Sequence, residues 1–304
     1  MRQAHRRGIV VGMNERYDVI IIGGGAAGLS GALTLARARR RVLVVDGGQP
    51  RNAPAEGVHN YLGRENTPPG ELLRIGRAEA GAYGAQFAEG NVVDARAEGG
   101  GFRVELDDDT SHTARKLLVA SGSTDELPDI AGVAEGFGRW VLHCPYCHGW
   151  EVRDRRIGVI ATGAMAAHQA LLWTQWSDDV VLFTNGREVA GVPAKVRVVE
   201  GPVQRVEAQG VHLGNGAFVE RDAIVVQTVP TARAGFLAGL GLATVDLVMQ
   251  GEAVATYVPA DPTGRTDVPG VWVAGNVTDP MAQVIVAAGG GLKAAAAMNM
   301  ELLE

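Results

Sequence analysis

Short apolar runs alternate with helical patterns along the chain, which is typical of α/β proteins built on mostly parallel sheets. The clearest unit predicts a strand over residues 18–22, a helix of small residues and a second strand that ends at Asp46. A second β-α-β rhythm runs over residues 155–188. Two similar units within 304 residues predict a duplicated fold of two domains.

Three glycines follow the first predicted strand in the order Gly-x-Gly-x-x-Gly. In a dinucleotide-binding turn, Gly23 would permit the tight bend, Gly25 would let a pyrophosphate approach, and Gly28 would let helix and strand pack closely. Asp46 would accept hydrogen bonds from a ribose hydroxyl. The sequence therefore predicts a dinucleotide site, and the expected contacts also include Ala26, Ala27 and Gly47.

The only cysteines, Cys144 and Cys147, lie in the stretch HCPYCHGWE between His143 and His148. A structural zinc ion needs four ligands, which so short a segment cannot supply, and no second Cys/His cluster exists. An inert reduced pair is the other alternative, and a redox disulfide is favoured over both. Pro145 suits the first position of a helical turn, whose peptide dipoles would favour a thiolate at Cys144.

The composition narrows the class of protein without identifying it. The chain has 46% hydrophobic residues, 20% charged residues and a formal net charge of -6, so nucleic-acid binding is not expected. No window reaches the roughly 18 apolar residues of a membrane helix, and the basic N-terminal stretch is too poor in apolar residues for a secretory signal. Two closely spaced cysteines favour the reducing cytoplasm.

From about Tyr17 onward, the chain resembles the low-molecular-weight thioredoxin reductase family of flavoproteins. Besides the glycine turn and the C-x-x-C pair, the resemblance rests on KLLVASGS at residues 116–123 and on the strand, turn and alanine-rich helix that begin at Gly270. It implies FAD as the cofactor and a homodimer. The FAD contacts that it implies in these segments are Gly122, Gly275, Asn276, Gln283 and Val284.

The resemblance also implies the fold and the roles of the two sulfurs. The expected fold is α/β with two Rossmann-like domains of the glutathione-reductase type, the second inserted in the first. The FAD domain would comprise residues 14–122 and 241–304, and the inserted domain, residues 123–240, would carry the cysteines. Cys147 would lie against the flavin, and Cys144 would exchange with the substrate. The stretch HNYLG would pass near the isoalloxazine, so His59 and Asn60 are expected either to line that pocket or to be turn residues.

The second nucleotide-binding unit departs from the family pattern. Ala161 stands at the first glycine of the expected Gly-x-Gly-x-x-Ala turn. Thr184-Asn185-Gly186 replaces an arginine pair that holds the 2'-phosphate of NADPH. Two lost charge-assisted hydrogen bonds of about 1.5–3 kcal/mol each would weaken NADPH by about two to four powers of ten. Arg187 is placed to recover part of this loss, and NADPH binding is doubtful.

His148 stands where the reductases carry an aspartate. An imidazole that titrates near pH 6.5 can take a proton from an incoming thiol and return it. Together with the degenerate nucleotide unit, C-x-x-C-H-G resembles FAD-dependent dithiol oxidases of the holomycin and gliotoxin type. His143 is a secondary catalytic candidate, and both histidines have a purely structural alternative.

Three functions follow from these observations. The favoured one is a dithiol oxidase that forms a disulfide in a small-molecule dithiol with O2 as acceptor. The second is a thioredoxin reductase-like enzyme that takes electrons from NADPH or another donor to a thioredoxin-like protein. The third is a flavin-bound redox sensor without turnover. No metal site is predicted.

Overall fold

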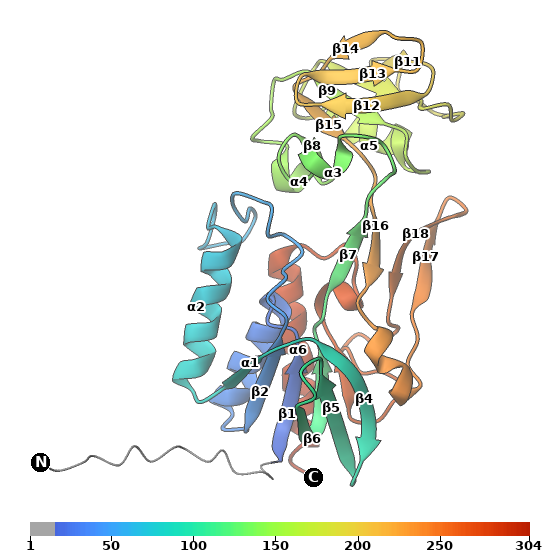
Figure 1. Cartoon of the computed structure of the whole chain (residues 1–304). Helices are drawn as coiled ribbons and strands as arrows, with labels where there is room; N and C mark the ends of the chain where they lie inside the picture. Colours follow the sequence, from blue (N-terminus) through green and yellow to red (C-terminus); the bar gives the residue numbers. More distant parts are fainter. Residues whose placement is uncertain (1–15) are drawn as a thin grey trace, which may run out of the picture.

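The computed structural model describes residues 16–304. Residues 14 and 15 of the predicted FAD domain, and the basic N-terminal stretch, lie outside the described residues. The described chain forms two lobes, and the paired antiparallel strands β7 (Ser123–Glu126) and β16 (Val229–Ala232) connect them (Figure 1). We call residues 17–122 and 233–304 the large lobe, and residues 127–228 the small lobe.

The large lobe is built on a seven-stranded sheet in the order β3-β2-β1-β6-β5-β4, with β19 paired to β6. Strands β1, β2, β3, β6 and β19 pair in parallel, whereas β4 and β5 continue the sheet from β6 as an antiparallel meander. The buried apolar runs of the sequence form the central strands. The bounds are β1 Tyr17–Ile22, β2 Val42–Asp46, β3 Gln86–Glu89, β4 Val92–Glu98, β5 Gly101–Leu106, β6 Ser111–Val119 and β19 Val271–Val273.

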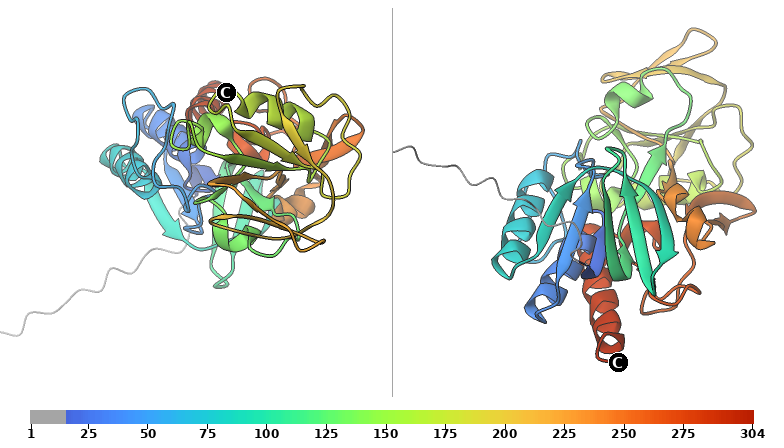
Figure 2. Two further views of the ribbon diagram at one scale, coloured as in Figure 1. Left: turned by 90° about the horizontal axis from the view of Figure 1, so that it is seen from above. Right: turned by 60° about the horizontal axis from the view of Figure 1, so that its bottom comes forward.

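Helices α1 (Ala26–Arg37) and α6 (Val284–Glu301) cover one face of this sheet (Figure 2). They pack closely because small residues face each other: a Cβ added to Gly291 would lie 1.9 Å from the Ala27 carbonyl oxygen. Helix α2 (Pro69–Ala82) lies beside α1. The 3-10 helix η1 (Gly235–Leu240) packs on the other face, and β18 of the hairpin β17–β18 (Val245–Met249 and Glu252–Tyr257) contacts β16.

The small lobe contains a five-stranded parallel sheet in the order β11-β10-β9-β15-β8. Strand β9, helix α5 (Ala166–Trp173) and strand β10 form the β-α-β unit that the sequence predicts. An antiparallel three-stranded sheet packs on the side away from the large lobe (Figure 1). The bounds are α3 Val133–Gly136, β8 Val141–Leu142, α4 Pro145–His148, β9 Ile157–Ile160, β10 Val180–Phe183, β11 Arg197–Val199, β12 Val203–Glu207, β13 Gly210–Leu213, β14 Phe218–Glu220 and β15 Ala223–Val225.

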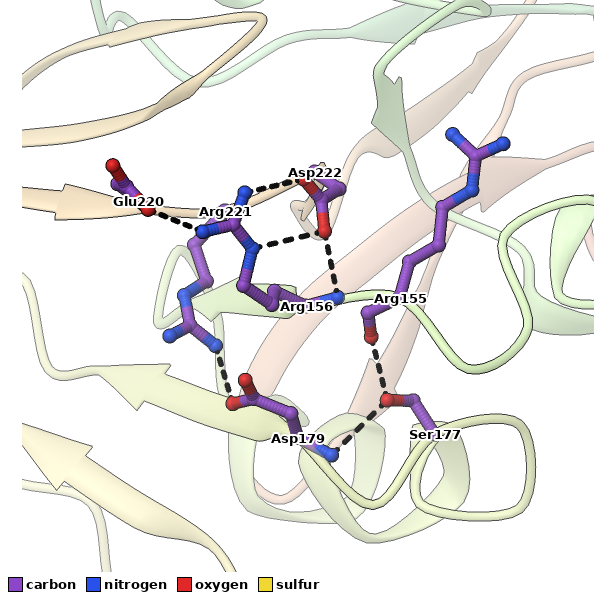
Figure 3. Close-up of polar contacts among 7 residues, drawn as sticks. All are labelled: Arg155, Arg156, Ser177, Asp179, Glu220, Arg221 and Asp222. Carbon is purple, nitrogen blue, oxygen red and sulfur yellow. Dashed lines mark hydrogen bonds and ion pairs between the residues drawn. The ribbon is translucent and has the colours of Figure 1, made fainter.

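An ionic network joins the amino ends of β9, β10 and β15 (Figure 3). Arg156 donates to both carboxylate oxygens of Asp222, at 2.7 and 3.0 Å, which lowers the pKa of Asp222 to about 2. Arg221 is buried and donates to Asp179 at 2.7 Å. Ligands of parallel sheets bind at the carboxyl ends of the strands. This network lies at the amino ends of the strands, so we assign it a structural role.

The predicted α/β fold with two Rossmann-like units is confirmed. The predicted domain boundaries stay a prediction. Residues 229–240, which that prediction places in the inserted domain, form β16 and η1, and Leu237 is buried in the core of the large lobe. Within residues 16–304, no helix combines the length and the apolar character that a membrane crossing requires.

Candidate active site

A cavity of about 1260 Å³ opens between the two lobes. Gly23, Asp46 and Gly275 line it from the large lobe, and Cys144 and Cys147 line it from the small lobe. The predicted dinucleotide site and the predicted redox pair therefore open into one cavity, at the carboxyl ends of β1 and β2.

The glycine turn between β1 and α1 leaves room for a pyrophosphate. A Cβ added to Gly28 would lie 1.9 Å from the Gly23 carbonyl oxygen, so Gly28 is needed for packing behind the turn. Gly25 is the N-cap of α1, makes no side-chain cap, and has no heavy atom within 4 Å of an added Cβ. The amino end of α1 therefore faces the cavity with uncapped N–H groups, which favour an anion.

Asp46 ends β2 at the cavity wall and is held by two donors. Its Oδ2 accepts a hydrogen bond from Arg77 at 2.9 Å, and its Oδ1 accepts one from the Gly48 amide at 3.2 Å. Arg77 was missed in the sequence because it lies in the middle of α2, far from any nucleotide motif.

The turn after β19 supplies another part of the large-lobe wall. Gly275 has φ +75, which favours glycine. The Asn276 side-chain nitrogen donates to the carbonyl oxygens of Asp279 and Ala282, both at 3.0 Å. An aspartate could not donate these bonds, so Asn276 orders the turn that leads to α6. Gln283 is the N-cap residue of α6, and its side chain makes no capping hydrogen bond.

The groups present fit the FAD that the resemblance implies. They are two uncapped helix amino ends, a turn with open space at the Cβ position of Gly25, and a carboxylate at the end of β2. The cavity is lined by most of the predicted contacts: Gly23, Gly25, Ala26, Ala27, Asp46, Gly47, Gly122, Gly275, Asn276, Gln283 and Val284. Gly28 packs behind the turn, and Asn60 does not border the cavity.

We expect Gly25→Ala to fold normally but to lose FAD, because the new methyl group meets no protein atom and projects into the pyrophosphate place. An overpacking cost of about 1–3 kcal/mol corresponds to a loss of roughly 5- to 150-fold in affinity. FAD content and thermal unfolding of the purified variant measure the two effects. Gly289→Ala on the exposed side of α6 is the matched control, since its Cβ also meets nothing. Full FAD content in Gly25→Ala would contradict this placement.

Asn60 contacts the cysteine turn instead of the cavity. Its side-chain nitrogen donates to the Tyr146 carbonyl oxygen at 2.7 Å, and its φ of 58 turns the loop toward the small lobe. Neighbouring His59 does line the cavity, where it lies 2.6 Å from Glu65 and 3.6 Å from Glu151. The sequence does not reveal this contact because it depends on the left-handed conformation of one residue.

Cys144 and Cys147 form a disulfide with a Cα–Cα distance of 5.3 Å. Cys144 is the N-cap of α4, and Pro145 is the first residue of that helix. The amides of Cys147 and His148 both donate to the Cys144 carbonyl oxygen at 3.2 Å. Within residues 16–304, no group of three or more His, Cys, Asp or Glu side chains could hold a metal ion.

His148 also lines the cavity, and its Nδ1 is buried without a hydrogen-bond partner. Burial lowers the pKa of His148 from 6.5, and Glu151 and the Cys144 carbonyl group oppose part of this shift. The side chain is therefore neutral at pH 7 and can accept a proton.

His143 lines the same cavity, and its ring is more deeply buried than that of His148. Burial lowers its pKa to about 4, against an opposing effect of Asp125. Its ring stacks on Phe137 with a centroid distance of 5.7 Å. Asp125 itself is held by both nitrogens of a bidentate Arg51 at 2.7 Å and by Thr228 at 2.8 Å. His143 is thus neutral throughout the physiological pH range.

In the second nucleotide unit, a side chain of the protein itself occupies the turn before α5. Gln227 follows β15, and its Oε1 accepts a hydrogen bond from the Met165 amide at the amino end of α5, at 3.2 Å. A Cβ added to Gly163 would lie 2.5 Å from the same side chain. Gln227 therefore occupies the place where a pyrophosphate would approach the turn. No motif in the sequence points to this residue.

At the end of β10, the cation that the sequence suggests for a 2'-phosphate is already paired. Arg187 forms an ion pair with Glu252 in β18 of the large lobe. The side-chain oxygen of Asn185 accepts from the Val203 amide at 2.9 Å. The compensation by Arg187 that the sequence suggests is therefore not supported by the geometry, because that guanidinium already has a carboxylate partner.

Comparison with known proteins places these features in a family. The model described as pyridine nucleotide-disulphide oxidoreductase matches residues 17–291. HlmI is 44% identical, with a TM-score of 0.88 over 95% of this chain and 93% of that chain. An oxidoreductase from Agrobacterium tumefaciens is 36% identical, with a TM-score of 0.89 over 95% and 99%. The thioredoxin reductase tcpT of Claviceps purpurea is 34% identical over 248 residues, which are 74% of this chain and 77% of that protein.

Proposed function

This chain belongs to the pyridine nucleotide-disulphide oxidoreductase family and is an FAD-dependent disulfide oxidoreductase, and from that premise we propose that it is a dithiol oxidase. The resemblance to thioredoxin reductase-like flavoproteins is confirmed. The observation that carries the proposal has two parts. A disulfide lines the cavity, and the side chain of Gln227 occupies the turn of the second nucleotide unit. The substrate is a small-molecule dithiol, and dioxygen is the final acceptor.

The composition of the small-lobe wall of the cavity supports a small, uncharged substrate. Among the described residues of the small lobe that line the cavity, none is Asp, Glu, Lys or Arg. A phosphate-bearing nucleotide would find no countercharge on this wall. An uncharged molecule loses little hydration energy there.

The proposed exchange uses two successive thiol attacks. One substrate thiolate attacks the sulfur of Cys144, the Cys144–Cys147 bond breaks, and Cys147 leaves as a thiolate. The second substrate thiol then attacks the substrate sulfur of the mixed disulfide, which forms the substrate disulfide and releases Cys144. The substrate loses two electrons and two protons, and the two cysteines gain the electrons. His148 takes the proton of the attacking thiol, because it is neutral and borders the cavity.

When bound, FAD would supply the two-electron acceptor that restores the disulfide, and we propose dioxygen as the final acceptor, with hydrogen peroxide as the product. The chain's own task is to hold the two sulfurs at the cavity. The Asn60–Tyr146 hydrogen bond and the His59–Glu151 contact tie the cysteine turn to the large lobe. A homodimer stays a prediction of the resemblance.

We expect NADPH to reduce the bound flavin far more slowly than a dithiol does, because Gln227 fills the turn and Arg187 is paired with Glu252. The measurement is the flavin absorbance during anaerobic titration, first with micromolar NADPH and then with dithiothreitol. Rapid stoichiometric bleaching by NADPH would favour the reductase function instead.

One observation favours a protein partner as the second candidate. Tyr146 is 54% exposed within the cysteine turn, Trp150 is 65% exposed just after it, and Leu62 is 93% exposed on the adjoining loop. Exposed aromatic side chains next to a redox pair suit a thioredoxin-like protein. Comparison of turnover with a thioredoxin and with small dithiols decides between the two, and sustained turnover with either excludes the redox sensor.

A further inference from the structure

We propose that Glu151 and His59 form a proton path, which carries the proton of the substrate thiol from His148 to solvent across the junction of the two lobes. This inference rests on the proposed dithiol oxidase function and adds two proton-transfer residues to it. It combines the position of His59 between two carboxylates, one on each lobe, with the place of Glu151 just beyond the cysteine turn.

The proton that His148 accepts needs a way out of the cavity. Oxidation of a dithiol to a disulfide releases two protons in each turnover. His148 lines the cavity, so a bound substrate would cover that side of its ring, and its Nδ1 is buried without a hydrogen-bond partner. The proton therefore leaves most directly through a neighbouring side chain.

Glu151 is the first acceptor on this path. It lies three residues after His148, just beyond the end of α4. Burial lowers the pKa of His148, and Glu151 opposes part of this shift, so the two groups are close enough to interact electrostatically. The side chain of Glu151 is 43% exposed. The carboxylate therefore lies near His148 and is also open to solvent.

His59 connects this carboxylate to a second one on the large lobe. Its Nδ1 lies 2.6 Å from Glu65, and its Nε2 lies 3.6 Å from Glu151, a gap that the exposed Glu151 side chain can close by rotation. Glu65 is held in place, because its other carboxylate oxygen accepts a hydrogen bond from the Asn60 amide at 2.9 Å. When Nδ1–H of His59 donates to Glu65, Nε2 carries the lone pair and faces Glu151.

The imidazole of His59 suits the transfer better than a carboxylate alone. A carboxylate holds a proton only briefly at neutral pH, whereas an imidazole both takes and releases one there. In the proposed sequence, Glu151 passes the proton from His148 to Nε2 of His59. The proton on Nδ1 then moves to Glu65, which is 62% exposed and releases it to water. Proton exchange between the ring nitrogens through water restores the starting tautomer.

The test measures anaerobic reduction of the flavin by dithiothreitol in the holoenzyme at low buffer concentration, with and without added imidazole. We expect His59→Gln and Glu151→Gln each to slow this reduction by about 10- to 100-fold, at the lower end of the contribution of a positioned acid–base group. Free imidazole should restore both rates to within about twofold of the wild type, because a diffusing base replaces the missing path. The double variant should be no slower than the slower single variant, since both residues act in one path.

Glu135→Gln is the matched control, because Glu135 is an exposed glutamate in α3 of the small lobe that does not line the cavity. It should keep the wild-type rate with and without imidazole. FAD content and thermal unfolding report on the folding of each variant. A slow reduction that imidazole does not restore, or a normal rate in either variant, would overturn the path. Failure of dithiothreitol to reduce the wild type would instead overturn the proposed function.

Discussion

Serine at either position of the Cys144–Cys147 disulfide is expected to reduce dithiol oxidation to the rate without enzyme. A lone cysteine can form a mixed disulfide but has no second sulfur with which to complete the exchange. Oxygen consumption with dithiothreitol measures the loss. Both variants should keep FAD, because the predicted flavin contacts all lie in the large lobe. Residual turnover in either variant would show that the dithiol reacts without the disulfide.

The two serine variants should differ in colour. If Cys147 faces the flavin, Cys144→Ser leaves a thiolate at Cys147 beside bound FAD, and a long-wavelength charge-transfer band should appear without added reductant. Cys147→Ser should show no such band, since Cys144 is the sulfur assigned to the substrate. The ultraviolet–visible spectrum of the purified proteins is the measurement. A band in Cys147→Ser alone would reverse the roles of the two sulfurs.

The sequence predicts the central elements well because their signals are local. The apolar runs that become β1, β2, β9 and β10 are buried on both sides, so they contain few polar residues, and the glycine turn follows directly from β1. Pro145 marks the start of α4 for a similar reason: its fixed φ and missing N–H suit a first helical position.

The features that the sequence does not reveal depend on contacts between distant segments. Gln227 lies 62 residues from Met165, whose amide it caps, and the two meet because β15 is inserted beside β9 in the sheet. In the sequence, Arg187 is a candidate cation for a phosphate, but the fold brings Glu252 of the large lobe into an ion pair with it. Motif spacing carries no information about such partners. Only the structure therefore shows that the chain's own side chains occupy the second nucleotide unit.

The same limit applies to the loop that carries His59 and Asn60. Its sequence suggests a flavin contact, and His59 does reach the cavity. Asn60 adopts φ 58 and directs its amide to Tyr146, which ties the loop to the cysteine turn. Together with the Arg187–Glu252 pair, this bond holds the two lobes with the disulfide facing the shared cavity. This arrangement supports the proposal that the small lobe serves the disulfide rather than a second nucleotide.

His148→Ala is expected to lower dithiol turnover by about 10²- to 10⁴-fold while FAD and the disulfide are retained, which is the usual contribution of a positioned acid–base group. The reason is that His148 borders the cavity directly after Cys147, and burial lowers its pKa below 6.5, so the neutral ring is available to accept a proton. Steady-state kinetics with dithiothreitol measure the loss. His212→Ala in β13, on the small-lobe sheet away from the cavity, is the matched control and should keep the wild-type rate.

The pH profile separates a proton-transfer role of His148 from a packing role. Burial and the neighbouring His59 lower the pKa of His148 below 6.5, while Glu151 and the Cys144 carbonyl group raise it in part. Only the neutral ring accepts a proton, so activity should be full above this lowered pKa and fall as the pH drops through it. Burial lowers the pKa of His143 to about 4, and this residue is unchanged in His148→Ala, so any limb that it causes would persist in the variant. His148→Ala should lack the acidic limb, and a limb that persists in the variant, or an unimpaired rate, would leave His148 with a structural role only.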